Sequence, residues 1–312
     1  MKSAKIKKQA ALLSVVSNSI LIFLKFLVGM LTGSISIISE AIHSFIDLLA
    51  SVIAFFSVKL SSEPADIEHQ YGHGKFEDLS GIIEGFLILV AAAYIIHEAT
   101  ERLMSGSIGH IETTAGIFIM LISVLMNTSV SSYLFKIANK TESVALFADA
   151  QHLKMDVYTS ISVLLGLIFI KLTNLVIFDS LIAIVVALLI IKAGINLCVI
   201  SGKNLLDTSL SKEERNIIEN TIKKYTSEGI IKVQGLKTRK AGAERLIDLT
   251  LVIPEVITIK EGHDLCNKIE EDLMKNIKNS NTTIHLEPCE GICSNCDLYY
   301  KDSLICHKFK NK

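Results

Sequence analysis

The segment ISIISEAIHSFIDLLASVIAFFSVKL at residues 35–60 is long and apolar, yet it contains ionisable side chains in its first half. A transmembrane helix needs about 20 largely apolar residues to cross a hydrocarbon core of roughly 30 Å. Within this run Glu40, His43 and Asp47 each cost roughly 2.5–3.5 kcal/mol to insert into hydrocarbon. The segment therefore predicts a membrane-spanning helix that carries a functional site.

A second segment, VALFADAQHLKMDVYTSISVLLGLIFIK at residues 144–171, repeats this pattern. His152 and Asp156 have the same His-x-x-x-Asp spacing as His43 and Asp47, which places the two side chains of each pair on one helical face. Each pair lies about 8–12 residues from the start of its helix, so antiparallel helices bring both pairs near the bilayer midplane. Two imidazoles and two carboxylates form a tetrahedral set that suits Zn²⁺. The alternative is that each helix buries a His–Asp hydrogen bond for packing.

Apolar segments of similar length extend on both sides of these two. We expect six transmembrane helices near residues 10–31, 35–60, 79–103, 114–135, 144–171 and 175–200. We expect the first to remain as a transmembrane helix and not to be a cleaved signal peptide, because polar residues such as Asn18 and Lys25 interrupt its apolar centre and no small-residue cleavage site follows. Lysines are concentrated at the N-terminus and in the 60–78 and 136–143 turns, which predicts that both termini are cytoplasmic.

Composition separates the chain into two parts. Half of the 312 residues are hydrophobic, 20% are charged, the formal net charge is −1 and the mean hydropathy is +0.47. These values exclude a disordered chain, a nucleic-acid-binding tail and an ordinary soluble enzyme. Charged side chains number 29 in residues 1–204 and 34 in residues 205–312. We therefore expect a transmembrane domain at 1–204, a soluble domain at 205–288 and a Cys-rich tail at 289–312.

The soluble part has the pattern of a small α+β domain. Ser211, followed by Glu213, Glu214 and apolar residues at helical spacing, predicts a capped amphipathic helix. Two β-rich runs at 230–238 and 245–253 are separated by an Ala-Gly-Ala turn, and a helix over 258–278 and a strand over 282–288 follow. The αββαβ order predicts an open sheet with helices on one face.

Four of the six cysteines lie near the end of the chain, at Cys289, Cys293, Cys296 and Cys306. Disulfides are not expected in a reducing cytoplasmic tail, so these thiols either bind a soft ion such as Zn²⁺ or remain free. The first three also have the spacing of radical SAM enzymes, but that motif opens a long barrel and only 16 residues follow Cys296. Cys198 and Cys266 are interpreted as apolar packing residues.

Together, several motifs identify a known family. They are the run from Ser34 through His43 to Asp47, Pro64-Ala65-Asp66 with Tyr71-Gly72-His73-Gly74-Lys75-Phe76-Glu77, and Ala148-Asp149-Ala150-Gln151-His152 to Asp156. This combination resembles the cation diffusion facilitator family, over nearly the whole chain to about Pro288. The resemblance implies six transmembrane helices, a metallochaperone-like cytoplasmic domain and a homodimer through that domain. It also implies export of Zn²⁺ or a related divalent metal ion in exchange for protons.

The resemblance also assigns site residues. His43, Asp47, His152 and Asp156 match the family's transport site. Many bacterial members have Asp at the first position, whereas zinc-preferring members commonly have His. The resemblance therefore implies that His43 favours Zn²⁺, and it leaves Co²⁺, Cd²⁺ and Fe²⁺ open. A loop site is matched by Asp66, His69 and His73. Metal positions at the family's dimer interface are matched by His263, His285 and Glu287, whereas Gln234 and Thr250 replace histidines there and place a full two-metal site in doubt.

Other polar residues have different expected roles, and two other functions are compatible with parts of the sequence. Lys154 is expected to pair with a carboxylate or to reach a wet cavity. Helix–helix polar contacts or interface positions are expected for Lys25, Glu84, His97 and Glu98. A membrane metallohydrolase would need three ligands, an open position and a base, for which Glu40 is the candidate. A metal sensor or passive channel is the other alternative.

Overall fold

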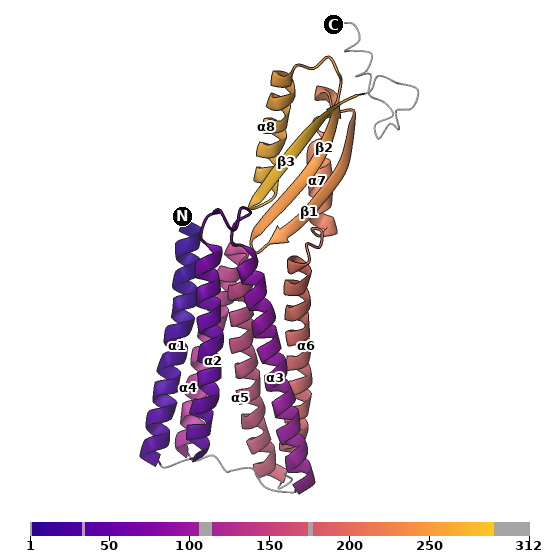
Figure 1. Cartoon of the computed structure of the whole chain (residues 1–312). Helices are drawn as coiled ribbons and strands as arrows, with labels where there is room; N and C mark the ends of the chain where they lie inside the picture. Colours follow the sequence, from indigo (N-terminus) through magenta and orange to yellow (C-terminus); the bar gives the residue numbers. More distant parts are fainter. Residues whose placement is uncertain (1, 33–34, 106–113, 174–176, 290–312) are drawn as a thin grey trace. The chain divides into compact units, whose positions relative to one another are not determined.

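The computed structural model describes residues 2–32, 35–105, 114–173 and 177–289 (Figure 1). The chain divides into two compact units, Met1–Leu205 and Leu206–Lys312, and each is described by itself. The first unit is helical, and the second contains a three-stranded sheet. An α-helical membrane part followed by a small α+β part confirms the fold class expected from the sequence.

Six long helices make up the described part of the first unit. They are α1 (Lys2–Thr32), α2 (Ile35–Ser61), α3 (Lys75–Ser105), α4 (Thr114–Thr141), α5 (Val144–Thr173) and α6 (Ile177–Leu205). Among the described residues, four stretches are long and apolar enough to cross a membrane: Ala4–Leu31, Lys75–Glu101, Ile117–Thr141 and Ser180–Leu205. The remaining two helices, α2 and α5, carry the His-x-x-x-Asp pairs. Several helices extend beyond the expected apolar segments because their polar ends continue the helical hydrogen-bond ladder.

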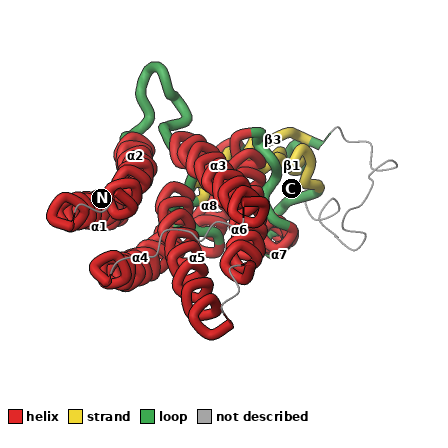
Figure 2. Tube along the Cα trace, turned by 90° about the horizontal axis from the view of Figure 1, so that it is seen from below, coloured by secondary structure: helices red, strands yellow, loops and turns green. Residues whose placement is uncertain are grey.

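Two buried apolar clusters hold the six helices of the first unit together, and Figure 2 shows these helices side by side. Helices α1, α2, α4 and α5 share one cluster, which includes Ala10, Leu134 and Leu146. Helices α3 and α6 pack closely together, and a second cluster joins them to α5. The close approach depends on glycine: a Cβ at Gly85 of α3 would lie 2.6 Å from Cys198 Sγ and 3.2 Å from the Gly194 carbonyl oxygen of α6. Small residues at facing positions are the usual means of tight helix packing in membranes.

A buried polar cluster joins helices that are far apart in the sequence. Lys7 Nζ of α1 lies 2.7 Å from Glu77 Oε1 of α3, and the Glu77 side chain is only 1% exposed. Ser61 of α2 donates to Glu77 Oε1 at 2.8 Å, and Ser143, just before α5, donates to Oε2 at 2.6 Å. One carboxylate therefore connects four parts of the helical unit, and every contact is a hydrogen bond to a charged group.

The second unit has the predicted αββαβ order. Its elements are α7 (Lys212–Lys223), a 3-10 turn (Thr226–Glu228), β1 (Lys232–Ala241), β2 (Glu244–Ile253), α8 (Ile259–Asn276) and β3 (Ser280–Pro288). The sheet order is β1-β2-β3, with β1 antiparallel and β3 parallel to β2. The parallel connection requires a crossover, which α8 supplies. Ser211 and Glu214 form the expected capping box of α7, and Thr258 and Glu261 form another on α8.

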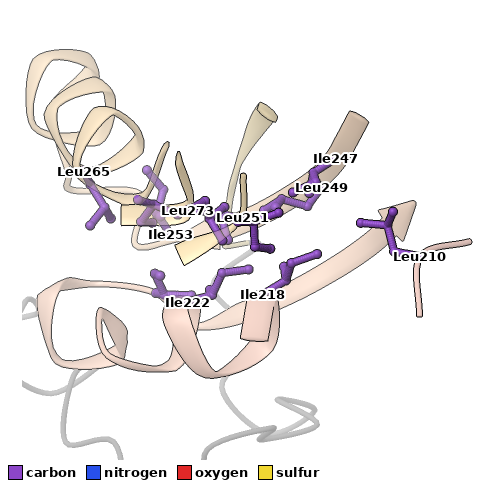
Figure 3. Packing of buried hydrophobic residues seen from close by; sticks show 12 residues of the cluster. Leu210, Ile218, Ile222, Ile247, Leu249, Leu251, Ile253, Leu265 and Leu273 are labelled. Carbon is purple, nitrogen blue, oxygen red and sulfur yellow. The ribbon is translucent and has the colours of Figure 1, made fainter. Parts of the chain in front are cut away.

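Both helices pack on one face of the sheet, as the sequence predicts. Figure 3 shows Ile218 and Ile222 of α7 and Leu273 of α8 facing the β2 side chains Leu249 and Leu251. Side chains alternate across a strand, so the intervening β2 residues point to the opposite, more polar face. Burying each large aliphatic side chain stabilises the folded unit by roughly 1.5–3 kcal/mol relative to leaving that side chain exposed.

Candidate metal centre

Helices α2 and α5 bring Asp47, His152 and Asp156 together. One ligand atom from each residue lies within 4.8 Å of the other two, and His152 Nε2 is 3.3 Å from Asp47 Oδ1. Asp47 and His152 are buried and Asp156 is half-buried. His152 and Asp156 are one turn apart on α5, which explains why both reach the same point. His43 lies one turn before Asp47 in α2, but its side chain is outside the described part of the structure.

A small cavity of about 30 Å³ adjoins these carboxylates. Its volume accommodates one or two water molecules or a partly hydrated ion. The cavity is polar, and helices α1, α2, α4 and α5 all contribute to it. Its lining residues are Asn18, Leu21, Lys25, Ser44, Asp47, Ser123, Asn127, Asp156, Thr159 and Ser160.

Hydrogen bonds connect this cavity to a second buried carboxylate. Asn18 Nδ2 donates to Ser51 Oγ at 2.7 Å, and Ser51 Oγ donates to Asp149 Oδ1 at 3.0 Å. Ser14 Oγ lies 3.0 Å from Ser51 Oγ. The residues that interrupt the first apolar segment therefore pack against α2 and α5. Sequence reasoning did not assign them to the site, although their helical spacing on α1 was the available signal.

The polar residues expected at helix contacts differ in their surroundings. Glu84 is fully buried in α3 and accepts a hydrogen bond from Ser80, and Lys25 is 5% exposed and donates to Ser44. His97, in contrast, is exposed, and Glu98 is half-buried. Lys154 is exposed, with its Nζ 5.7 Å from the Phe135 ring centroid and 5.6 Å from that of Tyr158. Lys154 thus lies over two aromatic rings and lines an open, mainly apolar cavity of about 1020 Å³, so it reaches a cavity as the sequence predicts.

A second group of possible ligands lies in the loop between α2 and α3. Asp66 Oδ2 is 3.3 Å from His73 Nε2, and Asp66 Oδ1 is 3.7 Å from His69 Nδ1. The two imidazole rings lie with their centroids 4.5 Å apart and their planes at an angle of 43°. The backbone N–H of His69 donates to Asp66 and is the main cause that lowers the pKa of this carboxyl, so Asp66 is ionised near neutral pH. Three ligand atoms within 4.8 Å of one another, two of them on exposed residues, suit a metal site with an open position.

The candidates in the α+β unit do not form such a group within one chain. His285 Nε2 lies 3.8 Å from Glu287 Oε1 on the exposed face of β3, and Gln234 Nε2 donates to Glu287 Oε2 at 2.8 Å. His263 is on the exposed side of α8, with its Nε2 3.3 Å from Asn267 Nδ2. The sequence resemblance places these residues between two copies of the chain, and that assignment stays a prediction.

The cysteine tail lies almost entirely outside the described residues. Cys289 is a free thiol, and its backbone N–H donates to the Ile253 carbonyl oxygen at 2.9 Å, which continues the β2–β3 ladder. Cys293, Cys296 and Cys306 lie outside the described residues, so metal binding by the tail stays a prediction. Cys266 is buried and Cys198 half-buried, in agreement with their interpretation as packing residues.

Comparisons with known proteins cover both units. Residues 11–206 match the cation efflux transmembrane domain, and residues 210–289 match the cytoplasmic domain of cation efflux proteins. An uncharacterized transporter of Synechocystis sp. is 33% identical over 288 residues, 92% of each chain. The cation-efflux pump FieF of Yersinia enterocolitica is 29% identical over 285 residues, 91% of this chain and 94% of the pump. A zinc-form structure of CzrB, described as a zinc transporter, is 30% identical and covers 26% of this chain and 92% of that chain, with a TM-score of 0.25.

Proposed function

This chain belongs to the cation efflux family, and we propose that it exports Zn²⁺ from the cytoplasm in exchange for protons. Membership makes it a multi-pass membrane cation transporter. The ion, the proton exchange and the residues that bind the ion are the proposal. The observation that carries it is the cluster of Asp47, His152 and Asp156 beside a small polar cavity inside the helical unit.

The donor set supports zinc as the transported ion. One imidazole and two carboxylates, with His43 one turn before Asp47 as the fourth candidate ligand, provide the nitrogen and oxygen ligands that Zn²⁺ accepts in tetrahedral sites. Mg²⁺ and Ca²⁺ prefer oxygen ligands alone, so histidine disfavours them. Co²⁺, Cd²⁺ and Fe²⁺ accept the same ligand types and are the alternative transported ions.

Proton exchange follows from the same ligands. An imidazole binds a metal ion only in its neutral form and a carboxylate only when ionised, so ion binding releases protons and protonation releases the ion. With alternating access around this site, a cytoplasmic ion displaces protons, and protons from the other side displace the ion. Asp66, His69 and His73 would bind ions in the loop before they enter, provided that both termini are cytoplasmic.

The remaining parts of the proposal concern assembly. We propose transport by residues 1–204, dimerisation through residues 205–288, and a separate cysteine tail from residue 289. The match to a cytoplasmic cation efflux domain at residues 210–289 supports the second assignment. His263, His285 and Glu287 are proposed to bind metal only where two copies of this domain meet.

Reconstituted vesicles test the function. The full-length protein is expected to move Zn²⁺ uphill when a pH gradient is imposed and to move protons in the opposite direction when a Zn²⁺ gradient is imposed. A passive channel would move Zn²⁺ only down its own gradient, and a sensor or hydrolase would move neither ion. Asp156→Ala is expected to abolish the flux, whereas Glu63→Ala, which removes an exposed carboxylate near the loop, should leave it intact. Normal flux with Asp156→Ala would remove this site from the mechanism.

A further inference from the structure

Lys25 is a lysine in the second half of the apolar helix α1, and it is almost completely buried. Its side chain extends from α1 to α2, where Nζ donates to Ser44 Oγ at 2.7 Å, and the residue is 5% exposed. A charged side chain at this depth is costly unless other groups compensate for its lost hydration. An apolar side chain would pack between the helices equally well. The presence of a charged group at this position therefore indicates a role for its charge.

The cavity supplies that reason, because Lys25 lines the same space as the two carboxylates. Lys25 and Ser44 line it together with Asp47 and Asp156, and its volume is only about 30 Å³. One or two waters cannot screen charges as bulk solvent does, so interactions across this space are several times stronger than in water. An ammonium group in this cavity therefore attracts the carboxylates and repels a divalent cation bound to them.

The order of residues along the helices places Lys25 toward one end of the cavity. Ser44 precedes Asp47 on α2 by about one turn, and Thr159 follows Asp156 on α5 by the same amount. Helices α1 and α5 run in the opposite direction to α2, so these residues all lie toward the end where α1 finishes and α2 begins. With a cytoplasmic N-terminus, that end is the outer side of the membrane.

We propose that Lys25 is a tethered counter-cation of the transport site and sets its affinity for divalent ions. When the ion has left, the fixed positive charge partly neutralises Asp47 and Asp156. The empty site can then return to its inward-open state. When the ion is bound, the same charge repels it and promotes its release. The inference deepens the proposed function and rests on it, and Lys25 acts through charge without binding the ion.

Zinc titration of the purified full-length protein tests this role. The quantity measured is the dissociation constant of the zinc-binding component that Asp156→Ala removes, so ions bound elsewhere do not count. Lys25→Met is expected to lower this constant by at least about tenfold, because a unit charge in the cavity no longer opposes the ion. The same variant is expected to transport zinc more slowly at saturating concentration. Lys25→Arg keeps the charge and should remain within about threefold of the unmodified protein.

Lys154→Met is the matched control, because it also removes one positive charge from a membrane helix but at an exposed position outside the cavity that Lys25 lines. Its zinc affinity should not change. An unchanged or weaker zinc affinity in folded Lys25→Met overturns the inference. An equally large decrease of the dissociation constant in Lys25→Arg, which keeps the charge, overturns it as well. If Lys25→Met does not fold, Lys25→Gln carries the same prediction. If the unmodified protein transports no zinc, the proposed function is contradicted. If it transports zinc normally but Lys25→Met has an unchanged zinc affinity, only the role of Lys25 as a counter-cation is contradicted.

Discussion

Replacing Lys7 by Met tests whether the buried cluster around Glu77 stabilises the helical unit. The substitution keeps the length of the side chain and removes its charge, which leaves Glu77 with the two serine hydroxyls as its remaining partners. Breaking a buried ion pair by removing one partner costs about 3–5 kcal/mol, because the other charge stays buried and uncompensated. For a domain of about 200 residues, each kcal/mol lowers the melting temperature by roughly 2–4 °C, so we expect a decrease of about 6–20 °C.

The measurement is the thermal unfolding of the detergent-purified full-length protein, followed by size-exclusion chromatography after heating. Lys8→Met is the control, because Lys8 lies 3.8 Å from Glu63 and both side chains are substantially exposed. Exposed pairs of this kind contribute about 0–1 kcal/mol. The double variant Lys7→Met with Glu77→Gln should recover part of the loss, since no isolated charge remains. Equal melting temperatures for Lys7→Met and Lys8→Met would refute the reasoning.

Two further substitutions probe packing and charge elsewhere. Gly85→Ala places a Cβ within 2.6 Å of Cys198 Sγ and should destabilise the helical unit by about 1–3 kcal/mol, whereas Gly202→Ala meets nothing within 4 Å and should be nearly neutral; similar melting temperatures would contradict this. In the α+β unit, burial raises the pKa of Glu214, but the hydrogen bond and charge of Arg245, whose Nε is 2.6 Å away, together with hydrogen bonds from Ser211, lower this pKa overall. This lowered pKa stabilises the folded unit above the ordinary Glu pKa, and the stabilisation is lost as the pH falls below it. Denaturation of Glu214→Gln should therefore vary less with pH between neutrality and acid than that of the unmodified protein, and an identical pH profile would exclude the ion pair.

Local sequence patterns predicted the secondary structure well because helices and capping boxes depend on neighbouring residues. Ser211 and Glu214 form the predicted capping box, and the Ala-Gly-Ala turn separates the two antiparallel strands as expected. The meeting of α2 and α5 was also predictable, since matched depth and opposite direction followed from the spacing of two identical motifs. His152 and Asp47 are the resulting contact.

Contacts without a repeated motif were not predictable in this way. Lys7 and Glu77 are 70 residues apart and belong to different segments, so neither indicates the other in the sequence. Lys25 was expected at a helix contact, but its place in the cavity with Asp47 depends on how α1 is rotated against α2. Helix rotation is determined by the packing of many side chains, and a single sequence does not specify it. The tail cysteines after residue 289 stay a prediction for a different reason, because they lie outside the described residues.

The glycine contacts between α3 and α6 have a consequence for sequence variation among relatives. At Gly85 and Gly194 the backbones approach so closely that neither helix has room for a larger side chain unless the other helix loses volume. Residues 85, 194 and 198 should therefore vary together, with enlargement on one helix matched by reduction on the other. Aligned sequences of relatives should show this compensation as covariation, and the pair of helices would then have evolved as one unit whichever ion each relative carries.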